Sequence, residues 1–236
     1  MKPVVAAALA SLLLVPACAQ ASLPRIAVQQ ETVELLATHA ARESPRTGGR
    51  FVAFVRFRRP ITDARTVLPV LAATIDTRGR SWLRVRLPGR ALGGRPASRT
   101  GWITSQNTLR SNTTWHLVVD VSARRVTVYR AGRWLRSYPA IVGKRSTPTP
   151  RGEYFVEENV QLPAGHSGAP FALATSARSN VLQEFDGGPG QIALHGRRNI
   201  GGQLGTAVSH GCVRLADSSI TWLAARIGPG VPVTIR

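Results

Sequence analysis

Apolar and polar residues alternate in short runs along much of the chain, a pattern typical of β-strands. Between residues 50 and 110 such runs occur at Phe51–Arg58, Val67–Ile75 and Trp82–Leu87, separated by clusters of Gly, Pro and Arg. A period of two places alternate side chains on one face of a sheet, where they can be buried together. The pattern therefore predicts a small all-β unit over residues 50–110.

A second β-rich unit is predicted from Trp115 onwards. Leu117–Asp120 and Arg125–Tyr129 alternate, a turn is indicated at Ala131-Gly132, and Trp134–Val142 follows. Closely spaced alternating runs joined by a Gly-containing turn are typical of hairpins. We expect an antiparallel meander here.

One short amphipathic helix is predicted near the end of the chain. Apolar residues fall at i, i+3, i+4 and i+7, namely Ile220, Leu223, Ala224 and Ile227. Asp217 is a candidate N-cap, and Gly228-Pro229 is a stop signal. A final strand is expected over Val231–Ile235. The fold class predicted from the whole pattern is mainly β, with one or two short helices.

The region before the first β unit has a different pattern. Pro24–Arg42 is rich in Ala and weakly helical, and Ser44–Arg50 contains a dense group of turn formers. We interpret residues 22–49 as a helical and linker segment.

The first residues indicate export. Lys2 precedes an uncharged run of 12 positions, Val4–Val15, which is shorter than the roughly 20 residues that a membrane-spanning helix needs. Residues 1–21 are therefore predicted to be a signal peptide, cleaved at the small-x-small site Ala19–Ala21. An alternative is a lipobox ending at Cys18, in which case the chain would be lipid-anchored to the outer face of the membrane. The expected location is the cell wall or periplasm.

Either form of processing leaves Cys212 as the only free thiol of the mature chain, because the sequence contains two cysteines. Exported proteins usually pair or avoid cysteines, so a lone thiol calls for a reason. Catalysis is one reason, and a buried, inert cysteine is the alternative.

The net charge of +19 favours polyanionic partners. The basic residues are spread along the chain, and the sequence contains neither an aromatic-basic RNA motif nor a basic recognition helix. We therefore expect no nucleic-acid partner, and anionic wall polymers fit an exported chain better. A solvated surface rich in Arg would also explain the charge.

The motif with the clearest chemistry surrounds this thiol. Ser209-His210-Gly211-Cys212-Val213-Arg214 lies just before the predicted helix, and His195-Gly196 lies 17 positions before Cys212. A thiol is only slightly ionised at neutral pH and needs a base nearby to act as a nucleophile. His195 can reach Cys212 from a neighbouring strand. Each histidine alone could be structural, but two His-Gly pairs around one thiol favour catalysis.

These residues resemble the signature of the L,D-transpeptidase family, also called YkuD-like. The resemblance covers about Trp115 to Arg236, and includes Gly143 and the stretch from Thr147 to Tyr154. Residues 112–236 are thereby expected to form the catalytic domain. Residues 82–90 and 100–103 similarly resemble the end of a bacterial SH3-like module, which implies an SH3-like β-barrel over 50–110 that binds wall peptides or orients its neighbour.

The resemblance to L,D-transpeptidases implies a role for each residue of the motif. Cys212 would be the nucleophile, His195 the base and the Gly196 carbonyl the group that orients the imidazole. The substrate and oxyanion region would be shaped by Ser209, His210 and Gly211. Arg214 stands where many members have Asn and could pair with a carboxylate of the donor.

The implied reaction is acyl transfer between peptidoglycan stem peptides, without a metal or cofactor. Cys212 would attack a tetrapeptide stem, release D-alanine and form a thioester, which an amine of a second stem would convert into a 3→3 cross-link. Such activity would serve cell wall biogenesis and cell shape, and carbapenems would be inhibitors. Two alternatives remain: an L,D-carboxypeptidase that uses water as acceptor, and a catalytically silent wall-binding protein.

Overall fold

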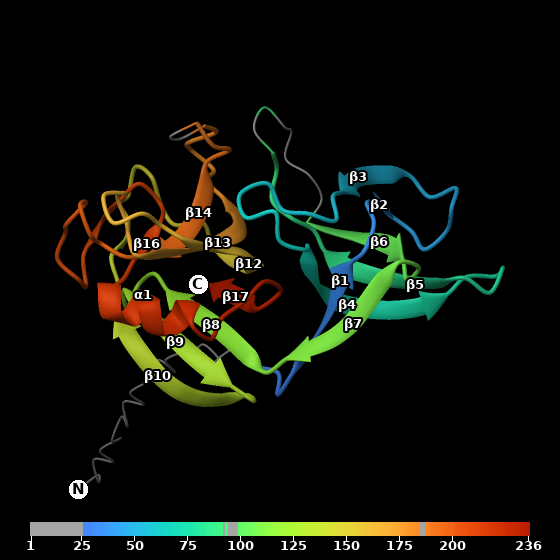
Figure 1. Cartoon of the computed structure of the whole chain (residues 1–236), viewed down its shortest axis with the longest axis horizontal. Helices are drawn as coiled ribbons and strands as arrows, with labels where there is room; N and C mark the ends of the chain where they lie inside the picture. The colour runs from blue at the N-terminus through green and yellow to red at the C-terminus, as the bar shows by residue number, and fades with distance from the viewer. Residues whose placement is uncertain (1–25, 92, 94–98, 185–186) are drawn as a thin grey trace, which may run out of the picture.

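The chain folds into two β-rich halves that lie side by side (Figure 1). The structure is a computed structural model, and it describes residues 26–91, 93, 99–184 and 187–236. The expected signal peptide and Cys18 lie outside these described residues. No helix within the described ranges is long and apolar enough to cross a membrane.

The first half is a seven-stranded sheet in the order β3-β2-β6-β5-β4-β1-β7. Its core contains Leu35, Leu68, Leu83 and Ile103, each at most 1% exposed. The three predicted runs of alternating residues are confirmed as β3, β4 and β5. The strands are β1 (Gln30–Leu35), β2 (His39–Arg42), β3 (Phe51–Val55), β4 (Val67–Ile75), β5 (Ser81–Arg86), β6 (Thr100–Thr104) and β7 (Thr108–Thr113).

The predicted helical segment over residues 22–49 is wrong, because β1 and β2 lie within it. β1 pairs with β4 on one side and with β7 on the other, so its backbone groups are satisfied by strands more than 30 residues away. Val33 and Leu35 alternate into the core. Tertiary pairing outweighs the weak helical propensity of this stretch. The first sheet therefore begins at Gln30 and not at residue 50.

The second half is an eight-stranded sheet in the order β10-β9-β8-β17-β12-β13-β14-β16, with a two-stranded sheet of β11 and β15 beside it. The predicted meander is confirmed as β8, β9 and β10. The predicted last strand, β17, lies between β8 and β12. The strands are β8 (Trp115–Asp120), β9 (Arg125–Arg130), β10 (Arg133–Pro139), β11 (Val142–Gly143), β12 (Gly152–Gln161), β13 (Phe171–Arg178), β14 (Gln191–His195), β15 (Ala207–Ser209), β16 (Val213–Arg214) and β17 (Pro232–Ile235).

Helix α1 (Asp217–Ala224) confirms the predicted helix, and its residues Ile220 and Leu223 are buried. The N-cap assignment to Asp217 is wrong: the N-cap is Ala216, and no side chain caps the helix. The Asp217 carboxylate instead accepts the Arg197 backbone N–H at 3.1 Å and pairs with Arg198. It therefore ties the loop after β14 to the start of α1.

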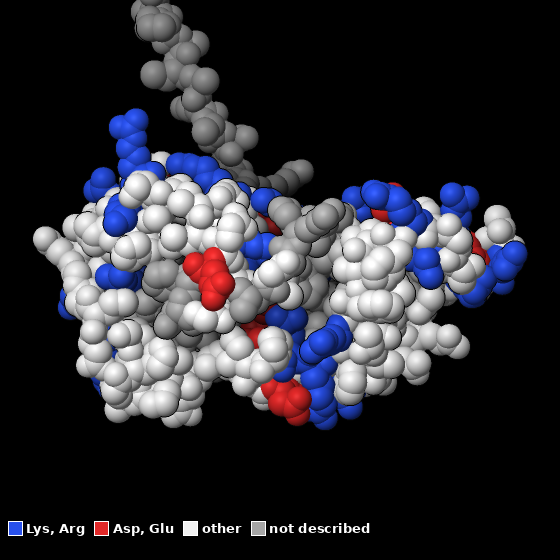
Figure 2. Space-filling model, turned by 90° about the horizontal axis from the view of Figure 1, so that it is seen from above, with Lys and Arg blue, Asp and Glu red and all other residues white. Residues whose placement is uncertain are grey.

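The surface charge is distributed over both halves. Figure 2 shows Lys and Arg side chains scattered across the visible face, with few Asp and Glu among them. The net charge of +19 is therefore not concentrated in a single basic strip on this face.

Candidate active site

His195 and Cys212 lie on neighbouring segments at the edge of the second sheet. β14 and β16 pair in parallel, with Leu194 opposite Val213 and His195 opposite Arg214. His195 ends one strand, and Cys212 immediately precedes the other. The parallel register therefore brings His195 and Cys212 to the same edge of the sheet. The sequence predicts this arrangement, in which His195 reaches Cys212 from a neighbouring strand.

A pocket of about 230 Å³ opens at this edge. Four predicted residues line it: His195, His210, Cys212 and Arg214. The remaining lining residues, which the sequence did not single out, are Ser179, Leu182, Gly190, Gln191, Ile192 and Ile200. Most of these residues belong to β14 or to the segment that precedes it, and no sequence motif includes them.

The His195 imidazole is oriented by a backbone carbonyl. Its Nδ1 lies 2.6 Å from the Gly196 oxygen, and since a carbonyl can only accept, Nδ1 carries the proton of the neutral ring. Nε2 is then the basic nitrogen. Burial lowers the pKa of His195 from 6.5 to about 4. The hydrogen bond to Gly196 acts to raise this pKa, and the charges of Arg214 and His166 lower it further. The imidazole is neutral at neutral pH and able to accept a proton.

The Cys212 thiol is surrounded by protein but still reaches the pocket. Its Sγ lies 3.8 Å from the Gln191 carbonyl oxygen, to which the thiol donates a weak hydrogen bond. Burial raises the pKa of Cys212, while a backbone hydrogen bond from Ala193 and the charge of Arg214 act in the opposite direction. The resting pair is therefore a neutral thiol with a neutral imidazole, and the thiolate must form by proton transfer during attack.

Ser209 supports the turn before Cys212 and lies outside the pocket. Its side chain is fully buried; its Oγ donates to the Cys212 carbonyl at 2.6 Å and accepts the Gly211 N–H at 3.2 Å. The sequence predicts that Ser209 helps to shape the substrate and oxyanion region; in the structure it supports the turn before Cys212 and does not line the pocket. Because the Gly211 N–H already has this partner, it is a poor candidate for an oxyanion donor.

Two threonines hold the same turn from the opposite side. Thr147 donates to the Ser209 carbonyl at 3.2 Å, and Thr149 donates to the Gly211 carbonyl at 2.8 Å. Thr149 also accepts the Gly143 N–H at 2.9 Å. The hydroxyl groups of Thr147 and Thr149 therefore fix the backbone of the turn that precedes Cys212. The resemblance to the family includes these residues, but only the structure shows what they bind.

Arg214 is anchored by its backbone and lines the pocket. Its N–H and C=O form a double bridge with Ile141, each bond 2.9 Å long. Its Nε is buried and has no hydrogen-bond partner among the described residues. Burial lowers the pKa of Arg214, whereas Cys212 acts to raise it. A buried donor beside the reactive pair is suited to a carboxylate or carbonyl of a bound ligand.

Two glycines fit closely around the base. A Cβ at Gly168 would lie 2.5 Å from His195 Nδ1, and a Cβ at Gly196 would lie 2.0 Å from the Ala169 carbonyl oxygen. Gly168 also has a φ of +88°, which L-residues rarely adopt. The segment before β13 therefore packs directly on the imidazole. Gly168 carries no signal in the sequence, since it is far from the motif and only the fold brings it there.

The described residues contain no group of three or more His, Cys, Asp or Glu side chains arranged to hold a metal ion. What the pocket does contain is a thiol, an oriented base, a cation and backbone donors. This set can carry out nucleophilic attack on a carbonyl with an acyl intermediate on sulfur.

Comparisons with known proteins show what the second half of the chain is similar to. A family model described as the YkuD L,D-transpeptidase catalytic domain matches residues 114–235. A putative L,D-transpeptidase from Bacillus subtilis is 31% identical over 122 residues, covering 52% of this chain and 66% of that protein. L,D-transpeptidase 1 from Mycobacterium tuberculosis is 29% identical over 126 residues, covering 50% and 49%. The aligned part thus spans between half and just under two thirds of these relatives.

Among solved structures, L,D-transpeptidase 3 from Mycobacterium tuberculosis in complex with a faropenem-derived adduct matches with a TM-score of 0.44. The two chains are 17% identical, and the match covers 73% of this chain and 92% of the other.

Proposed function

Because the chain belongs to the YkuD family of L,D-transpeptidase catalytic domains, we propose that it is a peptidoglycan L,D-transpeptidase acting through Cys212 and His195. The observation that carries this proposal is the shared pocket of the two residues, in which the Gly196 carbonyl turns the basic nitrogen of His195 away from itself. Members of this family are cysteine-dependent acyltransferases, and the pocket contains the groups that such chemistry needs.

In the first step the Cys212 sulfur attacks the carbonyl carbon of the third residue of a tetrapeptide stem. His195 Nε2 accepts the thiol proton and then donates it to the nitrogen of the departing D-alanine as the C–N bond breaks. A thioester on Cys212 remains. We assign the Cys212 N–H to the developing oxyanion, since the Gly211 N–H is engaged by Ser209.

In the second step an amine on the third residue of another stem attacks the thioester. His195 accepts a proton from the amine, the C–S bond breaks, and the sulfur leaves as the thiol once it is reprotonated. The product is a 3→3 cross-link. Water in place of the amine would give an L,D-carboxypeptidase, and the same pocket supports both acceptors. An intact thiol and base speak against a silent wall-binding protein.

The cellular setting is also a proposal. The sequence over residues 1–21 favours export, so we place the mature chain at the cell wall or in the periplasm, with a lipid anchor if Cys18 is acylated. Within the chain, we propose residues 112–236 as the catalytic domain and assign the SH3-like character to the preceding β unit. Carbapenems, which carry a reactive acyl group, should acylate the same sulfur.

Mass analysis of the purified protein with tetrapeptide stems tests the proposal. The wild-type chain should release D-alanine and acquire an acyl adduct on Cys212, and an added acceptor stem should yield a cross-linked product. Cys212→Ala should abolish both the adduct and turnover. His195→Ala keeps the thiol but removes its base, so acylation should slow by about 10²-fold or more. Turnover by Cys212→Ala at the wild-type rate would rule out the proposal.

A further inference from the structure

Two consecutive carboxylates of β12 are buried where the two halves of the molecule meet. The side chains of Glu157 and Glu158 are 0% and 1% exposed. Successive residues of a regular strand point to opposite faces, but the register of β12 against β13 shifts between Val156 and Glu158. Such a bulge re-aims side chains, and here both carboxylates reach groups of the first half.

Glu158 binds the turn that follows β3. Its Oε2 accepts the backbone N–H groups of Ile61 and Thr62, at 3.1 and 2.8 Å, and the Thr62 hydroxyl at 2.9 Å. Its Oε1 lies 3.6 Å from Arg59 Nε. The first half is thus held against β12 by polar contacts that are shielded from water.

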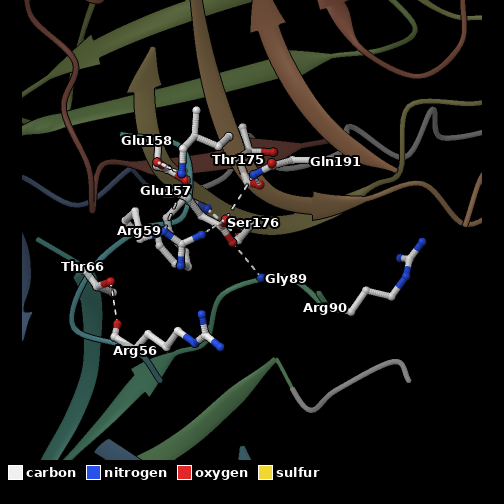
Figure 3. A network of polar contacts seen from close by, with 12 residues as sticks. Arg56, Arg59, Thr66, Gly89, Arg90, Glu157, Glu158, Thr175, Ser176 and Gln191 are labelled. Carbon is white, nitrogen blue, oxygen red and sulfur yellow. Dashed lines mark hydrogen bonds and ion pairs between the residues drawn. The ribbon is translucent and has the colours of Figure 1, made fainter. Parts of the chain in front are cut away.

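Glu157 is bound from both halves at once (Figure 3). From the first half it accepts the Gly89 N–H at 2.7 Å and a hydrogen bond from the Arg59 guanidinium. From the second half it accepts Arg178 Nη2 at 3.2 Å and Gln191 Nε2 at 3.1 Å. Buried charge-assisted bonds of this kind fix geometry closely. Glu157 therefore links the position of Arg59 to that of Gln191.

Gln191 extends this link to the reactive thiol. Its side-chain amide donates to Glu157 and also to the Thr175 carbonyl at 3.0 Å, which fixes the first residue of β14. Its own backbone carbonyl accepts the Cys212 thiol at 3.8 Å. The start of β14 therefore determines the immediate surroundings of Sγ.

We propose that Gln191 is a positioning residue for Cys212, and that the chain of contacts from Arg59 through Glu157 to Gln191 makes the first β half part of the working active site. This inference adds to the proposed transpeptidase function, and its main test needs no substrate. The sequence predicts that the unit over residues 50–110 binds wall peptides or orients its neighbour, and the inference gives the second of these roles a route through named contacts. The partners of Glu157 come from positions 59, 89, 178 and 191, so no local pattern could reveal it.

The main test compares Gln191→Met with the matched control Gln183→Met in the full chain. Met keeps the length of the side chain but removes both amide donors, and the Gln183 side chain is exposed. The rate of Cys212 alkylation by uncharged iodoacetamide would be followed from pH 6 to 10 by peptide mapping. The Gln191 carbonyl accepts a hydrogen bond from the neutral thiol, so loosening the start of β14 in Gln191→Met should shift the alkylation profile to lower pH and speed alkylation at pH 7 by about 3-fold or more. Gln183→Met should match wild type.

A second comparison tests the contribution of the first half. Arg59→Gln should shift the alkylation profile in the same direction as Gln191→Met, whereas Arg58→Gln, whose side chain is 45% exposed and pairs with Asp63, should leave it unchanged. The shifts caused by Arg59→Gln and Gln191→Met should also be non-additive in the double variant, because one chain of contacts joins the two residues. If Arg59→Gln does not fold, Gln191→Met alone decides.

The outcomes separate this inference from the proposed function. A purely structural role would lower the stability of Gln191→Met without moving the alkylation profile of its folded fraction, and that result would overturn the inference. Wild-type protein that alkylates normally but does not process stem peptides would overturn the proposed function instead. Where stem turnover is measured, Gln191→Met should lower kcat with little change in the donor KM, because the Gln191 amide faces Glu157 and Thr175.

Discussion

At the scale of single residues, the resting site keeps its thiol and its base uncharged. Burial pushes the two pKa values apart, lowering that of His195 to about 4 and raising that of Cys212. An imidazolium–thiolate pair would require the opposite order of the two pKa values. Cys212 is therefore protected from adventitious reaction until a carbonyl group is in place, which would suit a thiol in the exported chain that we propose.

This ordering predicts the pH dependence of Cys212 alkylation in the free enzyme. Because the pKa of the thiol is raised, the rate should be several-fold below that of a free cysteine at pH 7 and should keep rising beyond pH 9. Protonation of His195 should matter only near pH 4. Rates from iodoacetamide labelling between pH 4 and 10 provide the measurement. A plateau between pH 5 and 8 would show a preformed ion pair and contradict this account.

A second residue-scale prediction concerns Arg214. It lines the pocket, and its Nε is buried and unpartnered among the described residues, so we expect it to bind a carboxylate of the donor stem. Arg214→Asn should raise the donor KM by about 10-fold and lower kcat much less, provided that binding is near equilibrium. Steady-state kinetics with tetrapeptide stems would measure both. An unchanged KM and kcat would show that Arg214 does not bind the donor and that its role is structural, through the backbone bridge to Ile141.

At the scale of elements, the segment before β13 and the end of β14 form one unit around the base. Gly168 lies against His195, and its N–H donates to the Arg198 carbonyl at 2.9 Å, so the loop after the imidazole is held from this side too. Asp217 at the start of α1 holds the same loop through Arg197 and Arg198. The surroundings of His195 therefore depend on two segments that are distant from it in sequence, the one before β13 and the start of α1.

Gly168→Ala should disturb this packing. Its methyl group would lie 2.5 Å from His195 Nδ1 and would require a positive φ, so the imidazole must move away from the Gly196 carbonyl. We expect acylation of Cys212 to slow by about 10-fold or more, while alkylation at pH 9 changes little because it needs no base. Gly165→Ala, in the same loop and with open space around its Cβ, is the matched control. Equal acylation rates for the two variants would contradict this role.

At the scale of the whole molecule, the two halves share more than a covalent connection. Phe155 of β12 is 1% exposed and packs in the hydrophobic core of the first half. Phe155, Glu157 and Glu158 all belong to β12. This strand of the second half therefore contributes side chains to the core of the first half and to polar contacts with it. A protein built this way should unfold as one cooperative unit.

Removal of residues before 112 tests this cooperation. The shortened chain would expose Phe155, a loss of about 2 kcal/mol by its apolar area alone, and would leave Glu157 without Arg59 and Gly89. We expect a lower urea midpoint than that of the full chain, and slower acylation of Cys212. Equal stability and equal acylation rates would show instead that residues 112–236 are an independent domain.

The sequence by itself determined the family, the residues on which the proposed chemistry depends and much of the local structure. His195-Gly196 and the run from Ser209 to Arg214 form a motif of two short segments, and the meander, α1 and strands β3, β4 and β5 follow from periodicities that depend only on nearby residues. The tertiary structure decided the rest. β1 and β2 form because other strands of the sheet pair with their backbone N–H and C=O groups. Ser209 supports the turn before Cys212 because neighbouring segments bury its side chain. The links from Arg59 to Gln191 and from Gly168 to His195 join positions far apart in the chain, where only the closing of the sheets brings donors, acceptors and surfaces into contact.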